Sequence, residues 1–466
     1  MSYLLNLAYL AALALVWPWL LYKSIRQGKY REGFAAKFFG AVPRRQSGGP
    51  CLWLHAVSVG EVNLLSTLLA EIQRRRPDWE CVISTTTMTG YSLAKKKYAG
   101  RSVFYCPLDF SWAVRSAMRR IRPDCLVLAE LELWPNLIRA AREQGARVAV
   151  VNGRLSQRSH RGYRRVRPLI SRLLRQLDLI AVQNDEYAGR FLDLGASPEA
   201  VHITGSMKFD GAQTDRRNPA TLRLRRLAGI GDGDVVFLAG STQEPEEALA
   251  LAAYRELALE YPRLRLILVP RHPERFDAVA QLLDESGIGW QRRSILKDKP
   301  PTDDAWRATD DGPEIHPTVN PKSKIQNPKS KIPPVLLVDA IGELGAWWGM
   351  AQVAFVGGSL GQRGGQNMIE PAAYGAAVSF GPNTRNFRDI VALLLAARAA
   401  VVVQDGDELT AFVRRALADR HFAEGLGELA SRLVAGQLGA TSRTFELLAP
   451  LIEDPVYSAT PNRAAA

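Results

Sequence analysis

Short apolar runs recur along the chain at intervals of roughly twenty to thirty residues, and stretches with helical periodicity separate them. After the first run, for example, Val62, Leu65, Leu69 and Ile72 return at helical spacing. Strands that alternate with helices in this way form βαβ units, whose parallel sheet is covered by helices on both faces. The first half predicts strands at 52–56, 81–85, 102–105, 125–129, 147–151, 179–182 and 201–203. This pattern predicts an α/β fold.

The same rhythm starts again in the second half, after a polar link at 210–219. The chain has 466 residues, enough for two domains with separate cores. We therefore expect an N-terminal domain at 31–212, a C-terminal domain at 213–450 and a tail at 451–466. Two facing parallel sheets would leave a central cleft lined by the carboxyl ends of their strands, where ligands bind. Predicted elements of the second half are strands at 235–239, 264–269, 335–338, 353–356, 377–380 and 400–403 and helices at 246–259 and 408–417.

The segment 298–334 fits neither pattern. It is rich in Lys, Pro, Asp and Asn, and it contains NPKSKIQ followed directly by NPKSKI. Low hydrophobicity and repeated prolines do not repay the entropy of ordering a chain. We therefore expect a disordered insertion within the second domain.

The N-terminus carries an apolar run without a charged residue at 3–22, followed by a basic flank in which Glu32 is the single acid before residue 46. Such a run is about long enough to cross a bilayer, and flanking positive charge stays on the cytoplasmic side. A cleaved signal peptide would carry its charge before the apolar run. Residues 1–30 are therefore expected to be a hydrophobic anchor helix, spanning or interfacial, that holds the protein on a membrane with its body on the cytoplasmic side; the family resemblance described below identifies this membrane as the bacterial inner membrane.

The charge balance indicates an anionic partner. Lys and Arg number 60 against 47 Asp and Glu, an excess of 13. With the apolar N-terminus, we interpret this excess as attraction to an anionic lipid surface and a phosphorylated substrate, and we expect no nucleic acid. Four cysteines without CxxC spacing and six scattered histidines predict reduced core thiols and no metal site.

Glycines in the second half mark a candidate anion site. The strand at 353–356 ends at Gly357, Gly358 and Ser359, and the pair Gly364 and Gly365 precedes a helix start at 367–373. Free backbone N–H groups at a helix N-terminus favour a phosphate, and Glu370 could accept hydrogen bonds from ribose hydroxyls. Hydroxyl and backbone groups after the strand at 235–239 also suit a phosphate.

Polar residues at strand ends of the first half are candidates for chemistry. Glu61 begins the helix after the first strand, where the helix dipole favours its ionised form and suits a general base. The plainer interpretation is a favourable charge at a helix start. Glu130 and Glu132 follow a buried strand directly, and Lys208 follows the last one. A lysine there could neutralise developing negative charge.

Together these motifs resemble one enzyme family. HAVSVGEV, STTTMTGY, PLDF, ELELWPNL, NGRLSQRS, GSMKFD, PRHPERF and FVGGSLGQRGGQNMIEPAAYG occur in this order behind the basic-flanked N-terminus. The set resembles the bacterial 3-deoxy-D-manno-octulosonic acid (Kdo) transferases.

The resemblance implies a GT-B fold, two facing Rossmann-like domains, and an inverting glycosyltransferase that moves Kdo from CMP-Kdo to a lipid A precursor in lipopolysaccharide biosynthesis. It implies Glu61 as base, Glu130 and Lys208 as transition-state stabilisers, and no cofactor besides the donor substrate. The residues that it implies for nucleotide binding are Pro270, Arg271, Ile341, Gly342, Glu343, Asn367, Met368, Ile369 and Glu370. The chain departs from the family pattern at Gln243, Pro245, Gln366 and Asn383, which affects fine donor contacts.

Three alternatives stay open at this stage. Asp405 and Asp407 form a DxD pair that could hold a metal on a nucleotide, although helix N-terminal charges explain them more simply. The chain could be a transferase of the same architecture that uses another nucleotide sugar, such as a UDP-hexose. It could also be a non-catalytic, lipid-binding relative.

Overall fold

The computed structural model describes residues 2–27, 32–296 and 333–453, and it divides into two compact units. The first unit contains the described residues up to Gly211 and those from Gln437 onward, and the second contains those from Ala212 to Gly436. The predicted link at 210–219 therefore includes the division, whereas the C-terminal helices, placed by the sequence in the second domain, group with the first. The predicted insertion at 298–334 and the tail beyond Glu453 lie almost wholly outside the described residues.

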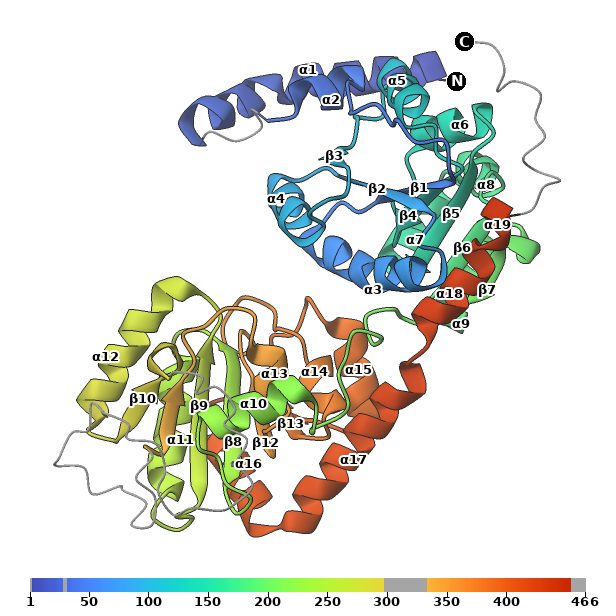
Figure 1. Ribbon diagram of the computed structural model, residues 1–466. Helices are drawn as coiled ribbons and strands as arrows, with labels where there is room; N and C mark the ends of the chain where they lie inside the picture. Colours follow the sequence, from blue (N-terminus) through green and yellow to red (C-terminus); the bar gives the residue numbers. More distant parts are fainter. Residues whose placement is uncertain (1, 28–31, 297–332, 454–466) are drawn as a thin grey trace. The chain divides into compact units, whose positions relative to one another are not determined.

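The first unit is built on a seven-stranded parallel sheet in the order β3-β2-β1-β4-β5-β6-β7 (Figure 1). All seven predicted strands of the first half are confirmed, with ends shifted by a residue or two. The strands are β1 (Cys51–His55), β2 (Glu80–Thr85), β3 (Val103–Tyr105), β4 (Cys125–Ala129), β5 (Arg147–Gly153), β6 (Leu179–Val182) and β7 (Val201–Ile203).

Helices cover both faces of this sheet, because alternate strand residues point to opposite sides. In β4, Leu126 and Leu128 pack into a core with α5 and α6, whereas Val127 packs into a second core with α3, α4 and α18. The helices of this unit are α1 (Ser2–Gln27), α2 (Phe34–Phe39), α3 (Val59–Arg75), α4 (Met88–Lys97), α5 (Ser111–Ile121), α6 (Pro135–Glu143), α7 (Gln157–Arg164), α8 (Arg167–Leu174), α9 (Asp185–Asp193), α18 (Ala440–Leu448) and α19 (Pro450–Glu453).

The second unit repeats the architecture with the order β10-β11-β9-β8-β12-β13-β14, again wholly parallel. Its six predicted strands are confirmed, and β10 (Trp290–Arg292) is an added edge strand. The others are β8 (Val235–Thr242), β9 (Leu264–Pro270), β11 (Val335–Leu337), β12 (Val353–Val356), β13 (Ala377–Phe380) and β14 (Val401–Val402). The helices are α10 (Pro219–Leu227), α11 (Glu246–Leu257), α12 (Phe276–Ser286), α13 (Leu344–Trp348), α14 (Ile369–Ala373), α15 (Arg388–Ala396), α16 (Gly406–Ala418) and α17 (Arg420–Gln437).

The apolar N-terminal run forms α1, and two of its polar side chains attach it to the first unit. Asn6 is buried and exchanges hydrogen bonds with Ser111, and the Tyr9 hydroxyl donates to Asp109 Oδ2 at 3.1 Å. No helix among the described residues, α1 included, combines the length and apolarity that a bilayer crossing requires.

The four cysteines are all free and buried, which confirms their interpretation as reduced core residues. Burial raises the pKa of Cys51 to about 12 and that of Cys81 to about 11. The thiols are therefore protonated and unreactive at neutral pH.

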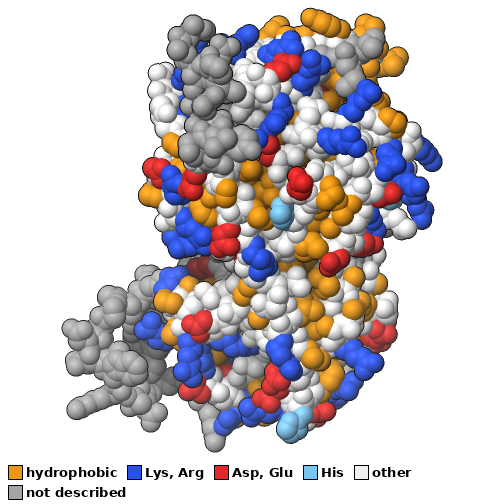
Figure 2. All heavy atoms as spheres, turned by 90° about the vertical axis from the view of Figure 1, so that its right-hand side faces the viewer, with side chains coloured by type: hydrophobic (Ala, Val, Ile, Leu, Met, Phe, Trp, Pro, Cys, Tyr) orange, Lys and Arg blue, Asp and Glu red, His pale blue; other side chains and the backbone are white. Residues whose placement is uncertain are grey.

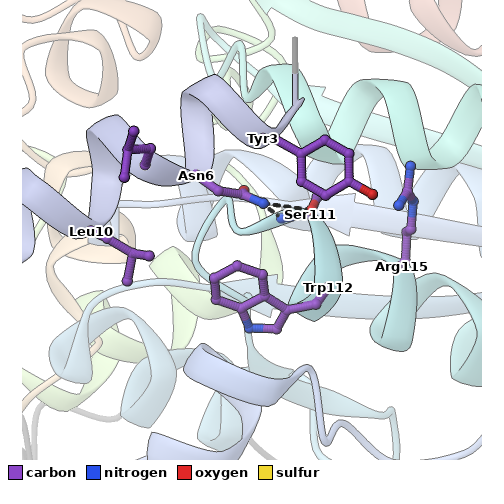
Figure 3. A pocket seen from close by; sticks show the side chains of 7 residues that line it. Tyr3, Asn6, Leu10, Ser111, Trp112 and Arg115 are labelled. Atoms are coloured by element: carbon purple, nitrogen blue, oxygen red, sulfur yellow. Dashed lines mark hydrogen bonds between the residues drawn. The ribbon is translucent and has the colours of Figure 1, made fainter.

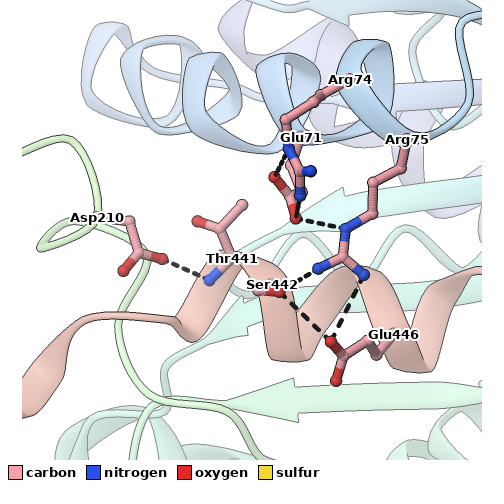
Figure 4. Close-up of polar contacts among 7 residues, drawn as sticks. All are labelled: Glu71, Arg74, Arg75, Asp210, Thr441, Ser442 and Glu446. Atoms are coloured by element: carbon pink, nitrogen blue, oxygen red, sulfur yellow. Dashed lines mark hydrogen bonds and ion pairs between the residues drawn. The ribbon is translucent and has the colours of Figure 1, made fainter.

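The C-terminal helices are fastened to the first unit by polar contacts at α18 (Figure 4). Asp210 accepts hydrogen bonds from the backbone N–H groups of Gly439, at 2.6 Å, and Thr441, and so caps α18 from a distant segment. Arg75 of α3 contacts Glu71 on its own helix and Ser442 and Glu446 on α18.

Replacing Asp210 by alanine should loosen this attachment. Two N–H groups at the start of α18 lose their acceptor, and loss of a cap costs about 1 to 2 kcal/mol. We expect the free energy of unfolding of the first unit, measured by urea titration, to fall by this amount. Glu199→Ala, at an exposed position of the same unit, is the control and should change it by less than about 0.5 kcal/mol.

Candidate active site

In each unit the strand order reverses at one point, and parallel α/β sheets bind ligands beside such points at the carboxyl ends of the strands. The reversal lies between β1 and β4 in the first sheet and between β8 and β12 in the second. The polar residues predicted from the sequence follow these strands and their neighbours.

Glu61 lies in the first turn of α3, directly after β1. Its carboxylate accepts hydrogen bonds from the Val57 N–H at 2.9 Å and the Ser58 hydroxyl at 2.7 Å, and its own N–H donates to Ser58 Oγ at 3.2 Å. This reciprocal arrangement is a capping box. The interpretation as a helix-start charge is therefore confirmed, and the role as base stays a prediction, since a carboxylate has acceptor capacity beyond two bonds.

Burial raises the pKa of Glu61, and the nearby charge of Glu130 acts in the same direction. The hydrogen bonds from Val57 and Ser58 oppose this shift, because they favour the ionised form. A raised pKa makes a carboxylate a stronger base than an ordinary glutamate.

The structure brings Glu130 and Lys208 together, although they follow β4 and β7, which two other strands separate in the sheet. Glu130 Oε1 lies 2.9 Å from Lys208 Nζ, and both side chains are partly exposed. Glu130 has a φ of +54°, in the left-handed region that non-glycine residues rarely adopt. Strained backbone of this kind concentrates at functional sites.

Glu132 belongs to the same group of carboxylates, although the family resemblance gives it no role. It accepts a hydrogen bond from the Trp134 ring nitrogen at 2.9 Å. Burial raises its pKa, and Glu61 and Glu130 add to this effect through their charges. Three carboxylates and one lysine thus share the carboxyl edge of the first sheet.

Two buried residues next to this edge were missed by sequence reasoning. Asn152, at φ +54° near the end of β5, accepts a hydrogen bond from the Met207 N–H at 3.0 Å and so fixes the residue before Lys208. His55, the last residue of β1, contacts Ser84 Oγ through Nδ1 at 2.9 Å. Burial lowers the pKa of His55 to about 4, so its ring is neutral at pH 7. The asparagine before a glycine at a strand end was the available signal for Asn152.

In the second unit, the glycine turn after β12 has its backbone N–H groups bonded within the protein, whereas the anion was predicted at the helix start that follows the second glycine pair. The N–H groups of Gly358, Ser359 and Leu360 all donate to the carboxylate of Glu246, at 2.7 to 2.9 Å. Glu246 begins α11, is 1% exposed and also accepts from the Gln243 N–H. An internal carboxylate therefore satisfies the N–H groups of this turn.

The second glycine pair is also bonded within the chain. Gly365 donates its N–H to the Gly358 carbonyl at 2.7 Å, and the Gly364 carbonyl accepts from the Asn386 N–H at 2.9 Å. The predicted helix at 367–373 is confirmed as the single turn α14. Its first N–H, that of Ile369, is capped by Asn367 Oδ1 at 3.1 Å.

Arg271, Asn367 and Glu370 do lie together at the carboxyl edge of the second sheet. Asn367 Nδ2 donates to Glu370 Oε1 at 3.0 Å. Burial raises the pKa of Glu370, and the positive charge of Arg271 opposes that shift. Arg271 follows Pro270, the last residue of β9, and is exposed. Met368 and Ile369 are buried, so only their backbone could contact a ligand.

The turn at Ile341, Gly342 and Glu343 is confirmed, but its acid is already paired. Glu343 receives two hydrogen bonds from Arg293, from Nε and Nη2, each at 2.8 Å. Gly342 has a φ of +92°, and the Ile341 side chain is 79% exposed. Arg293 was missed, because its short 3-10 turn carries no motif.

The DxD pair caps a helix. Asp405 Oδ1 accepts from the Glu408 N–H at 2.9 Å at the start of α16, which confirms the helix-charge interpretation. Within the described ranges, no three metal-ligating side chains gather in a metal-binding arrangement.

Comparisons with known proteins agree on one family. The family profile of 3-deoxy-D-manno-octulosonic-acid transferase (kdotransferase) matches residues 30–211. The chain is 33% identical to a 3-deoxy-D-manno-octulosonic acid transferase of Bordetella pertussis, over 93% of this chain and 95% of that protein. It is 31% identical to one of Haemophilus influenzae, over 92% and 94% of the two chains.

Solved structures resemble the chain in fold. A glycosyltransferase from Rickettsia africae superposes with a TM-score of 0.51 and 10% sequence identity, over 88% of this chain and all of that one. This likeness shows a GT-B-like α/β fold with two parallel sheets.

The buried contact of Glu246 generates a prediction. In Glu246→Gln, one carboxylate oxygen is replaced by an NH2 group, which cannot accept a hydrogen bond. The backbone N–H groups that this oxygen now satisfies would lose their acceptor, and each unsatisfied buried donor costs about 1 to 3 kcal/mol. We expect the free energy of unfolding of the second unit, from urea titration, to fall by at least about 2 kcal/mol. Glu256→Gln, at an exposed position of α11, should leave it within about 0.5 kcal/mol. An equal loss in both variants would contradict the role given to Glu246.

Proposed function

This chain belongs to the 3-deoxy-D-manno-octulosonic acid (Kdo) transferase family, and on that premise we propose that it transfers Kdo from CMP-Kdo to a lipid A precursor. One observation carries the proposal. The ion pair of Glu130 and Lys208 lies at the same sheet edge as the buried carboxylate of Glu61, beside the point where the strand order reverses.

The proposed reaction is a single displacement. A hydroxyl oxygen of the acceptor attacks the anomeric carbon of Kdo, and the bond from that carbon to the phosphate oxygen breaks with its electron pair leaving on CMP. Glu61 accepts the proton of the attacking hydroxyl. The configuration at the anomeric carbon is inverted.

Lys208 supplies positive charge for the anionic groups of the reacting sugar and leaving group. The 2.9 Å contact with Glu130 restrains its long side chain, which lowers the entropy lost on binding. The left-handed backbone of Glu130 directs this carboxylate from the strand end. A lysine restrained before the reaction stabilises charge with little reorganisation.

Donor binding is assigned to the second unit. Arg271 would pair with the CMP phosphate, and Glu370, whose carboxylate is oriented by Asn367, would accept hydrogen bonds from the ribose hydroxyls. The turn at Ile341 to Glu343 would contact the base, with Arg293 fixing its acid.

Glu61→Gln tests the base. We expect kcat for formation of the Kdo-lipid product, followed by mass spectrometry, to fall about 100-fold to 10,000-fold. In the wild type, the rate should fall on acidification at a pH above 4.5, the ordinary glutamate value, because burial raises the pKa of Glu61 and only its ionised form accepts a proton. Turnover unchanged in the variant would reject Glu61 as base. Assays with UDP-hexoses in place of CMP-Kdo test the alternative donor.

We further propose that α1 and α2 hold the protein on the cytoplasmic surface of the inner membrane. Exposed apolar side chains include Leu15 at 83% and Phe39 at 59%. Lys23 lies 4.1 Å above the Trp19 ring, so basic and aromatic groups occur together near one end of α1. Figure 2 shows apolar side chains with Lys and Arg side chains near them at the top of the view, where Figure 1 places α1. Helices of this composition lie in the headgroup region of anionic bilayers.

Vesicle sedimentation tests this attachment. Leu15→Glu combined with Phe39→Glu should reduce the fraction bound to phosphatidylethanolamine and phosphatidylglycerol vesicles at least about tenfold, since each apolar side chain contributes about 1.5 to 3 kcal/mol when buried. Leu259→Glu changes an equally apolar residue, 74% exposed, in the second unit and should bind as wild type. Binding unchanged in the double variant would contradict the proposal.

A further inference from the structure

A buried cluster of polar side chains joins α1 to the segments around α5 and α6, and we call these five residues the α1 socket: Asn6, Tyr9, Asp109, Ser111 and Asn136. Asn6 Nδ2 donates to Ser111 Oγ at 2.7 Å, and the Ser111 N–H donates to Asn6 Oδ1 at 3.0 Å (Figure 3). Asn6, Asp109, Ser111 and Asn136 are each at most 6% exposed. A polar cluster this deep is costly unless every member is bonded.

Polar contacts hold this end of α1. A pocket of about 380 Å³ opens between α1 and α5, lined in part by Leu7, Leu10 and Trp112. These apolar side chains are therefore not fully packed against one another. The hydrogen bonds of Asn6 and Tyr9, together with the edge-on contact of the Tyr9 ring with Phe110, fix the helix in place here.

Asp109 is the centre of the socket. Its Oδ1 accepts from the Leu137 N–H at 2.8 Å, and its Oδ2 accepts from the Asn136 N–H at 3.0 Å and the Tyr9 hydroxyl at 3.1 Å. α6 has no side-chain cap of its own at Trp134. Asp109 therefore caps α6 from another part of the chain, and Tyr9 of α1 completes the coordination of that carboxylate.

The first turn of α6 is one end of the loop that carries Glu130 and Glu132. At the other end, the Glu130 N–H donates to the Val151 carbonyl at 3.0 Å. In between, the Trp134 ring nitrogen donates to Glu132, and the Trp134 N–H donates to the Glu132 carbonyl at 3.2 Å. Where the first turn of α6 lies thus determines where these two carboxylates lie.

We infer that docking of α1 in the α1 socket fixes the loop that carries Glu130 and Glu132, with Asp109 as the positioning residue. Its catalytic consequence rests on the proposed function. When α1 leaves the α1 socket, Asp109 loses the hydrogen bond from Tyr9, and Ser111 loses its hydrogen bonds with Asn6. The first turn of α6 is then held less tightly. The enzyme then turns over more slowly, even where no membrane is present.

The test combines hydrogen exchange with kinetics in detergent micelles, so that loss of membrane binding has no effect. Asn6→Ala with Tyr9→Phe removes the donors of α1, and Asp109→Ala removes the cap. Tyr22→Phe is the matched control, since it makes the same change at an exposed site on the same helix. We expect amides at 130–134 to exchange at least about tenfold faster in the double variant, with strand amides of β1 and β4 unchanged.

We also expect kcat to fall about tenfold with KM for CMP-Kdo unchanged, because donor residues belong to the second unit. Unchanged exchange at 130–134 in the double variant would overturn the inference, and so would equal acceleration in Tyr22→Phe. Asp109→Ala should accelerate exchange at 130–134 in the same way, and the double variant keeps the test valid if Asp109→Ala does not fold. Hydrogen exchange is measured without substrate. If the wild type does not transfer Kdo, that result rejects the proposed function and leaves the inference about the loop to be decided by exchange.

Discussion

A carboxylate removed from water must receive hydrogen-bond donors, and this requirement organises both units. Glu61 takes donors from Val57 and Ser58, Asp109 from the start of α6, and Glu246 from the loop after β12. In each case at least one donor is a backbone N–H of a loop or helix start at the carboxyl edge of a sheet. An unpaired carboxylate there would cost several kcal/mol, so each one fixes the loop that satisfies it.

The internal carboxylates fall into two groups, those that hold loops in place and those proposed to act on the substrate. Glu246 and Asp109 are saturated by protein donors and hold loops in place. Glu130 is paired with Lys208 and partly exposed, and Glu61 is buried yet has acceptor capacity left. The residues proposed to touch substrate are therefore the less completely satisfied ones, on loops held by the saturated ones. Preorganisation of this kind is what charge stabilisation during a reaction needs.

The sequence predicted the strands well, because buried parallel strands are continuous apolar runs bounded by turn residues. β10 was missed, since Trp-Gln-Arg has no such run. The sequence placed Glu130 and Lys208 at strand ends but did not predict their pairing, because β5 and β6 separate the two strands in the sheet. Glu246 could not be predicted, because its partners lie 112 to 114 residues away and resemble a phosphate-binding glycine turn. The role of Asn6 could not be predicted either, because its partner Ser111 is 105 residues distant.

The return of the C-terminal helices to the first unit has a consequence for biosynthesis. α18 covers α3 and is capped by Asp210, so part of the first core is made by residues near the end of the chain. Most domains fold in order as they leave the ribosome. Here the first unit cannot complete its core until the whole second unit has been translated, because α18 comes after it in the chain. The apolar surface that α18 covers is exposed during that time, and a chaperone could bind it during synthesis.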